Sequence, residues 1–146
     1  MDVKKEIVKE NQRVTVSKRM LKDAMIRLLG KKPIQQISVS ELCREAGVNR
    51  STFYRLYSIP IEVMEDIIQE HITRINSMIS FSEDARMENT KMIYKYLFDH
   101  RDVFIPILHN YDYRIIVMLE KKFYNVFRKN TDSLSQRKNV SLSALF

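Results

Sequence analysis

The polar residues after Gly47 are the group whose types and spacing best suit the binding of a ligand. Asn49, Arg50, Ser51 and Thr52 form one run, and Arg55 follows three residues later. Short hydroxyl and amide side chains can approach base edges closely, and an arginine can bind guanine or a phosphate. This run predicts a surface that contacts duplex DNA. The alternative interpretation is an ordinary solvated helix face.

Other chemistry has little support in the residue pattern. The three histidines, His71, His100 and His109, lack the spacing of metal ligands, and the single cysteine, Cys43, has no second cysteine beside it. The sequence contains no phosphate-binding loop, dinucleotide-binding glycine pattern or nucleophile elbow. We therefore expect no metal, no cofactor and no enzymatic activity.

The excess positive charge is confined to one part of the chain. Residues 1–60 contain 13 lysines and arginines against 6 acidic residues, whereas residues 61–146 contain 12 of each. Such a distribution is typical of an electrostatic footprint for a polyanion joined to a neutral module. A solvated lysine-rich surface is the alternative.

Composition restricts the fold class and the compartment. Two glycines and three prolines are too few for the frequent turns of an all-β protein, and 45% hydrophobic residues are ample for a core. No run approaches the ~18 apolar residues of a membrane span, and the N-terminus has no apolar signal-peptide core. A lone cysteine suits a reducing compartment. We expect an all-α, soluble, cytoplasmic protein.

Capping signals divide the first part of the chain into helices. Ser17 is a plausible N-cap for a helix that ends at Gly30, where Pro33 then prevents its resumption. Ser38 with Glu41 is a capping box, so a second helix should follow Ser38 and end at Gly47. A third helix is expected from Arg50 to about Tyr57. Pro60 should open a fourth helix that runs to about Ser80.

The remaining sequence gives weaker signals. Residues 81–87 are expected to form a loop, a helix is expected around residues 92–97, and it should end near residues 99–102. Residues 103–108 form a short apolar run around Pro106. A last helix is expected over residues 112–129, followed by a weakly patterned polar tail.

Gly47 lies where two short helices would have to cross steeply. A helix of about eight residues, a glycine turn and a second short helix is the spacing of a helix-turn-helix. The turn residue needs a positive φ, which glycine adopts without steric cost. Leu42, Val48, Phe53 and Leu56 would supply the packed faces, and the small Cys43 would allow close approach. A redox-sensing Cys43 is the alternative.

The segment from about Ser17 to Ile68 resembles the N-terminal domain of TetR-type transcriptional regulators. The resemblance is carried by the helix SKRMLKDAMIRLLGKKP, the core ISVSELCREAGVNRSTFYRLY and the start of the fourth helix in IEVMEDI. It implies a three-helix head that binds DNA and an all-helical second module that dimerises and often holds an effector ligand. On this basis Tyr54 and Ser38 would contact phosphates, and Asn49 to Thr52 would face the bases. The candidate DNA-binding residues are Ser38, Ser40, Asn49, Arg50, Ser51, Thr52, Tyr54 and Arg55.

Two features depart from the TetR pattern. Pro60 stands where the family usually has a lysine that touches the DNA backbone, and only 86 residues follow it, so the second module is short. We expect a repressor that occupies near-palindromic operator DNA, as a dimer if the short module still pairs. The rival interpretation is a TetR-like adapter or co-regulator that binds a protein and has weak or no DNA binding.

The expected organisation is therefore a DNA-binding domain over residues 1–59, with a disordered or helical arm at residues 1–16, and a dimerisation and effector module over residues 60–146. Large apolar side chains of the second module would either fill its core or line a cavity for an apolar effector. The candidate pocket residues are Met92, Tyr96, Phe104, Leu108, Met118 and Phe123.

Overall fold

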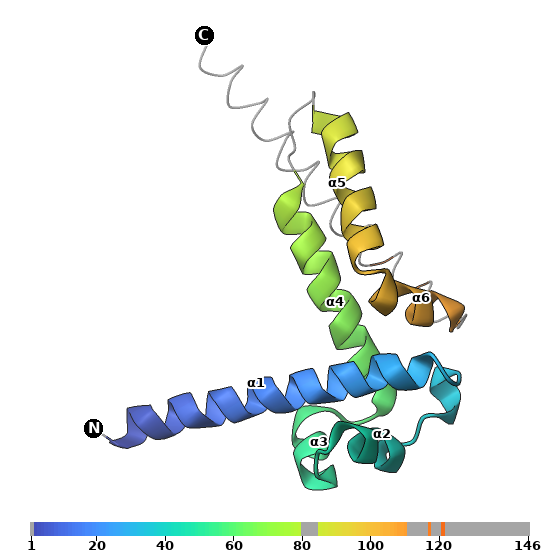
Figure 1. The fold of residues 1–146 in the computed structure, drawn as a ribbon. Helices are drawn as coiled ribbons and strands as arrows, with labels where there is room; N and C mark the ends of the chain where they lie inside the picture. The colour runs from blue at the N-terminus through green and yellow to red at the C-terminus, as the bar shows by residue number, and fades with distance from the viewer. Residues whose placement is uncertain (1, 80–84, 111–116, 118–120, 122–146) are drawn as a thin grey trace. The chain divides into compact units, whose positions relative to one another are not determined.

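The fold is known from a computed structural model that describes residues 2–79 and 85–110, together with residues 117 and 121. These residues form six α-helices and one 3₁₀ turn, with no strand among them (Figure 1). The expected all-α class is confirmed. The helices are α1 (Asp2–Leu29), α2 (Val39–Ala46), α3 (Arg50–Leu56), α4 (Pro60–Met78), α5 (Arg86–Asp99) and α6 (Arg101–His109), and the 3₁₀ turn η1 is Ile34–Gln36.

The chain forms two compact units. Among the described residues, the first unit contains residues 2–70 and 100–110, and the second contains residues 71–79 and 85–99. The expected boundary between residues 59 and 60 falls inside the first unit. Helix α4 begins in the first unit and ends in the second, and α6 returns the chain to the first unit.

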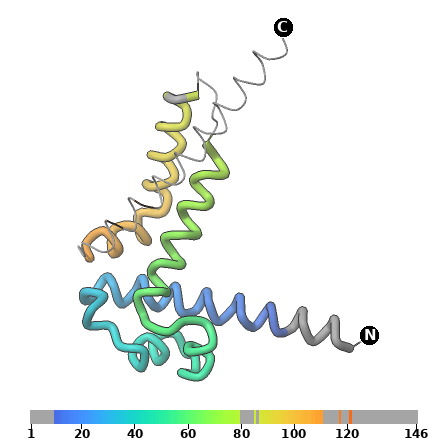
Figure 2. Tube along the Cα trace, turned by 180° about the vertical axis from the view of Figure 1, so that it is seen from behind, coloured from blue at the N-terminus to red at the C-terminus, as the bar shows by residue number. Residues whose placement is uncertain are grey.

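The core of the first unit is built on α1. Figures 1 and 2 show from opposite sides that α2 and α3 pack along one side of this helix, and α6 contacts it as well. Apolar residues at helical spacing line its buried face, as the sequence indicates. Buried side chains of this core include Leu21, Ala24, Met25, Leu28, Leu42, Phe53, Val63, Met64 and Ile107.

Helix α1 begins far earlier than the sequence capping signal suggested. Ser17 is not its N-cap, because the helix runs without interruption from Asp2 to Leu29. The segment before Ser17 is rich in lysine and glutamate, which are good helix formers. Val14 is half-buried, and it lies seven residues before the buried Leu21 on the same face. The arm at residues 2–16 is therefore a continuation of α1.

Local signals predicted the next three helices well. Helix α2 begins after Ser38, whose hydroxyl oxygen accepts a hydrogen bond from the Glu41 N–H at 3.2 Å. Helix α3 starts at Arg50 and has Tyr57 as its C-cap. Helix α4 starts at Pro60, as expected of a residue that cannot donate a backbone hydrogen bond.

The apolar run around Pro106 is helical, although the sequence predicted no helix there. Helix α6 spans Arg101–His109 and contains Pro106. The carbonyl that this proline leaves without its helical donor belongs to Asp102, an exposed residue open to water. Ile107 of α6 is buried in the core of the first unit, where α6 contacts α1, and this packing stabilises the helix.

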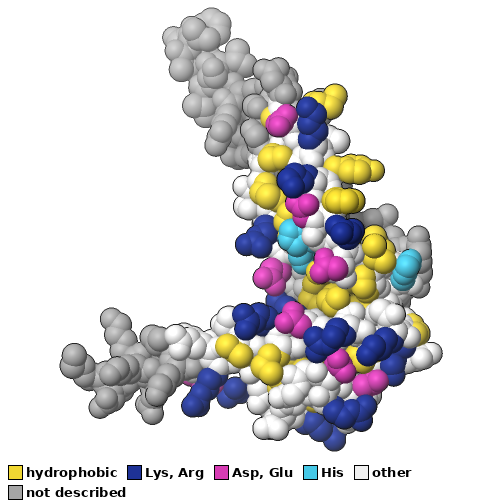
Figure 3. Space-filling model, viewed as in Figure 1, with side chains coloured by type: hydrophobic (Ala, Val, Ile, Leu, Met, Phe, Trp, Pro, Cys, Tyr) yellow, Lys and Arg dark blue, Asp and Glu magenta, His cyan; other side chains and the backbone are white. Residues whose placement is uncertain are grey.

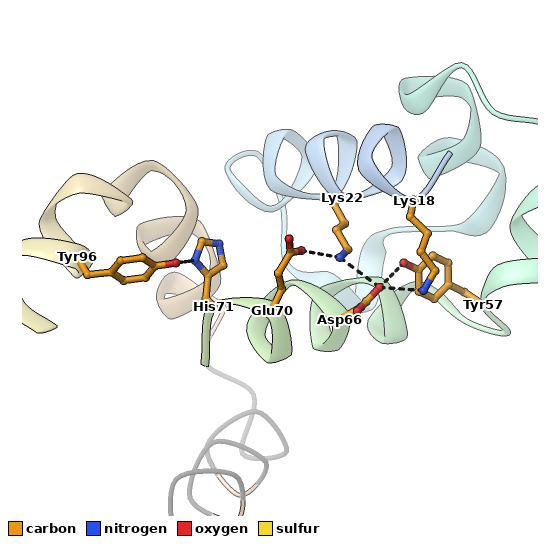
Figure 4. A network of polar contacts seen from close by, with 7 residues as sticks. All are labelled: Lys18, Lys22, Tyr57, Asp66, Glu70, His71 and Tyr96. Carbon is orange, nitrogen blue, oxygen red and sulfur yellow. Dashed lines mark hydrogen bonds and ion pairs between the residues drawn. The ribbon is translucent and has the colours of Figure 1, made fainter. Parts of the chain in front are cut away.

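Within the second unit, α5 contributes the buried Tyr96. The Tyr96 hydroxyl is hydrogen-bonded to His71 Nδ1 at 2.7 Å (Figure 4). The expected helix over residues 112–129 and the polar tail lie outside the described residues. None of the described helices combines the length and the apolar content that crossing a membrane would require.

Candidate nucleic-acid interface

The turn between α2 and α3 has a backbone that favours glycine. Gly47 has φ 65° and ψ 31°, in the left-handed region, and no other described residue has a positive φ. The Val48 N–H donates to the Cys43 carbonyl at 3.0 Å, which closes the end of α2. A Cβ built at Gly47 would meet its nearest neighbour, Met20 Cε, at 3.8 Å. The site therefore needs glycine for its backbone angle rather than for lack of space.

Packing fixes which side of α3 faces outward. Phe53 is fully buried, and Leu42 and Cys43 on α2 are buried with it. Val48 and Leu56, which were expected to face the core, are half-buried. The candidate residues are placed differently: Asn49, Arg50 and Ser51 are exposed, and Thr52 is half-buried.

Two residues at the start of α3 have polar groups available for a ligand. Asn49 occupies the N-cap position, but its side chain makes no capping hydrogen bond to the helix. Asparagine at this position commonly caps a helix with its side chain. Because the Asn49 amide does not do so, it can bind another partner. Within the described part of the chain, Arg50 takes part in no ion pair.

Tyr54 is exposed, and its ring contacts the buried Phe53. Its side chain is 54% exposed. The Tyr54 and Phe53 rings are nearly perpendicular, with ring centroids 5.5 Å apart and an interplanar angle of 84°. Because Phe53 is buried in the core, this contact restricts the Tyr54 ring, while more than half of the Tyr54 side chain stays open to solvent.

Arg55 is not free. Its guanidinium is 2.9 Å from a carboxylate oxygen of Glu10, and both side chains are about half exposed, at 53% and 49%. The sequence did not predict this contact because the first helix was expected to begin after Ser17. The continuation of α1 brings Glu10 beside the last turn of α3.

The candidate serines lie at the start of α2. Ser38 and Ser40 are both exposed, and Ser38 Oγ already serves as the N-cap acceptor. As an acceptor it still retains its own O–H for donation to an anion. These two hydroxyls belong to the same unit as the start of α3.

Cations balance the acidic residues of α2. Lys32 binds Glu41 at 2.7 Å, and Arg27 binds Glu45 at 2.7 Å. The hydrogen bonds from Lys32 and Arg27 hold the pKa values of these carboxyls below their ordinary value. Figure 3 shows Lys and Arg side chains along α1 and at the lower edge of the first unit, with acidic side chains between them.

Cys43 has the environment of a packing residue. It is 4% exposed, and burial raises the pKa of its thiol, although the nearby charge of Arg50 acts in the opposite direction. A reactive cysteine needs a lowered pKa and access to solvent. The packing interpretation is therefore favoured over redox sensing.

A polar network between α1, α4 and the end of α3 was missed by the sequence analysis. Asp66 accepts a hydrogen bond from the Tyr57 hydroxyl at 2.7 Å, and the ammonium groups of Lys22 and Lys18 lie 3.3 and 3.4 Å from the same oxygen (Figure 4). The signal available was a lysine pair at i, i+4 on one helix and an acid pair, Asp66 and Glu70, at i, i+4 on another. Pairs of this kind mark one positively and one negatively charged helix face, which the sequence analysis did not single out.

The candidate pocket residues lie on different helices. Met92 and Tyr96 belong to α5, while Phe104 and the 58%-exposed Leu108 belong to α6. Met118 and Phe123 lie outside the described residues. An effector pocket therefore stays a prediction.

The chain matches no protein-family model, no curated protein and no solved structure.

Proposed function

We propose that this chain is a sequence-specific DNA-binding transcriptional regulator of the TetR type, in which α2, the Gly47 turn and α3 act as a helix-turn-helix. One observation carries the proposal. The first residues of α3 are exposed and polar, while Phe53, three residues further along, anchors the helix in the core. A short helix held from behind with a polar N-terminal end outward is the form in which such motifs enter the major groove.

The roles of the residues follow from their chemistry. Arg50 donates to guanine or to a phosphate, and Asn49 pairs with an adenine edge. Ser51 and Thr52 are small enough to allow a close approach. A well-formed two-point contact between a side chain and a base is worth about 1–3 kcal/mol of discrimination against the wrong base.

Phosphate contacts would set the position of the head on the duplex. Tyr54 on α3 is exposed, and so are Ser38 and Ser40 at the start of α2, so all three hydroxyl-bearing residues are open to a phosphate. Such contacts carry little sequence information but fix the register. Pro60 supplies neither a charge nor an N–H, so the start of α4 contributes no charged contact.

Regulation would use two heads. In a dimer, two α3 helices about 34–36 Å apart would match successive major grooves, so the operator would be close to palindromic. Binding of an effector would favour a different spacing of the heads and release the DNA. The chain then acts as a repressor that occupies its operator.

A second function, that of an adapter that binds a protein, has one observation in its favour. Met87 and Tyr94 on α5 are 70% and 77% exposed. They are seven residues apart and therefore lie on the same face of the helix. Large apolar side chains on one face are common at protein-binding surfaces.

A titration with labelled duplex DNA distinguishes the two functions. A pool of random duplexes is first passed over the chain, and the selected duplex and a random duplex of equal length are titrated at several salt concentrations. The regulator should prefer the selected duplex and lose affinity steeply as salt rises. An adapter should bind both duplexes weakly or not at all, at every salt concentration.

Variants show whether the binding uses α3. Arg50→Ala should weaken binding to the selected duplex, and Tyr54→Phe should weaken it as well. Lys91→Ala is the matched control, because it removes one exposed positive charge from α5 in the second unit. Equal losses for Arg50→Ala and Lys91→Ala would mean that α3 does not read the DNA.

A further inference from the structure

One acidic residue is the centre of the polar network in the first unit. A single carboxylate oxygen of Asp66 on α4 lies 2.7 Å from the Tyr57 hydroxyl, 3.3 Å from Lys22 Nζ and 3.4 Å from Lys18 Nζ. Figure 4 shows Lys18 and Lys22 extending from α1 toward Asp66. Tyr57, the C-cap of α3, approaches the same carboxylate with its hydroxyl. Asp66 therefore joins three helices.

The network is shielded enough for its bonds to hold a geometry. Tyr57 is 7% exposed, and the Asp66 side chain is 29% exposed. Lys18 also lies over the Tyr57 ring, 5.4 Å from its centroid. On the far side, Glu70 binds Lys22 at 2.7 Å and holds that ammonium toward α4.

Tyr57 connects this network to the DNA-reading helix. Its backbone N–H donates to the Phe53 carbonyl, so it caps α3 directly. Helix α3 has only seven residues and is about 10 Å long. A tilt of about 10° at its capped end would move its first residues by about 2 Å, more than the ~0.5 Å that binding geometry tolerates.

We propose that Asp66 is a positioning residue for DNA recognition, which holds the C-terminal end of α3 through Tyr57 and so aims its N-terminal end. This inference rests on the function proposed above. Asp66 itself does not touch DNA. Phe53 is the buried residue of α3, and the bond from Asp66 to the capping Tyr57 adds a second fixed point at the end of this short helix.

The sign of the effect separates this role from simple electrostatics. DNA is a polyanion, so removal of an acidic residue from the head should strengthen binding to any duplex. Loss of positioning does the opposite for the selected duplex, because base contacts are lost while charge contacts remain. The ratio of the two affinities is therefore the informative quantity.

The test measures the dissociation constants of the wild type and of Asp66→Asn for the selected duplex and for a random duplex of equal length. Asp66→Asn should lower the preference for the selected duplex about tenfold, the size of one lost base contact. Its affinity for the random duplex should stay equal or rise. Asp23→Asn is the matched control, because Asp23 is exposed on α1 and its replacement makes the same chemical change. It should leave the preference within about twofold.

A second variant separates positioning from a loss of folding. Tyr57→Phe keeps the ring and the net charge but removes the bond to Asp66, and it should lower the preference in the same direction. In the double variant the loss should be smaller than the sum of the two single losses, because Asp66→Asn already weakens the Tyr57 bond that Tyr57→Phe removes. Circular dichroism at the assay temperature confirms that each variant is folded, so that stability alone does not move the ratio.

The outcomes are distinct. A wild type that binds no duplex overturns the proposed function and this inference with it. A wild type that prefers its selected duplex, with an unchanged preference in folded Asp66→Asn or Tyr57→Phe, overturns the positioning role alone. Additive losses in the double variant also overturn it.

Discussion

Replacement of Gly47 by alanine tests the physical reason for the turn between α2 and α3. Gly47 has φ 65°, and its missing Cβ would lie 3.8 Å from Met20 Cε, an ordinary contact distance. The alanine side chain therefore has room, and only the backbone angle opposes it.

A non-glycine residue in the left-handed region costs about 1–2 kcal/mol. Part of this is offset by about 0.4–1 kcal/mol, since alanine reduces the conformational freedom of the unfolded chain. Gly47→Ala should therefore lower the free energy of unfolding by about 1 kcal/mol. For a chain of 146 residues this corresponds to a fall in Tm of about 2–4 °C.

Urea denaturation followed by circular dichroism measures this difference. Gly47→Asn should lose less than Gly47→Ala, because asparagine enters the left-handed region more readily. Met20→Ala is the control background. The cost of Gly47→Ala should be the same in it, because Met20 does not crowd the site. A cost that disappears in the Met20→Ala background, or one above about 3 kcal/mol, would show that side-chain crowding, and not the backbone angle alone, opposes the alanine.

Three further predictions follow from contacts of the first unit. Glu10→Gln should raise the affinity for duplex DNA about two- to fivefold, because it releases Arg55 from an exposed ion pair. Unchanged or weaker binding in a polarisation titration would contradict the role of this ion pair. Asn110→Ala should lower the free energy of unfolding by about 1–3 kcal/mol. The buried amide accepts from the Ile34 N–H at 2.7 Å and donates to the Leu29 and Pro106 carbonyls, and these bonds would be lost. Urea denaturation measures the change, and an unchanged urea midpoint would count against that role. Burial raises the pKa of Asp66, but the Tyr57 hydroxyl and two ammonium groups outweigh it and hold this pKa below 3.8. The stability that the ionised carboxylate contributes is therefore present above about pH 4 and is lost as the pH falls further. The difference in unfolding free energy between the wild type and Asp66→Asn should therefore shrink between about pH 5 and pH 2, and a difference that grows would reverse the sign of this argument.

Local sequence signals predicted the elements whose determinants lie within a few residues. Ser38 and Glu41 marked the start of α2, Gly47 its end and Pro60 the start of α4, because caps, left-handed turns and helix-opening prolines act over one turn of chain. The exposed start of α3 and the buried Phe53 followed from the same short-range pattern.

Contacts between distant residues decided the features that the sequence analysis missed. The start of α1 was misplaced because Ser17 looks like a cap, whereas the chain before it continues the same helix and pairs with α3 through Glu10. Asn110 binds groups 76 and 81 residues away, at Ile34 and Leu29, and thereby joins the end of α6 to the head. No local pattern encodes such a partner.

The Asp66 network has the same origin. Lys18 on α1, which hydrogen-bonds Asp66, is 48 residues away in sequence. Tyr57 is nine residues from Asp66 and lies at the end of a different helix. Spacing at i, i+4 marks a charged helix face, but it does not name the face that will oppose it. The crossing of α1 and α4 supplies that information.

The most direct test of the central claim is an amide chemical-shift titration of the isotope-labelled chain with the selected duplex. We expect the largest shifts on residues 49–55 and 38–40, and we expect them to weaken as salt is added. Shifts concentrated on α5, or no shifts at any DNA concentration, would contradict the claim that the start of α3 reads DNA.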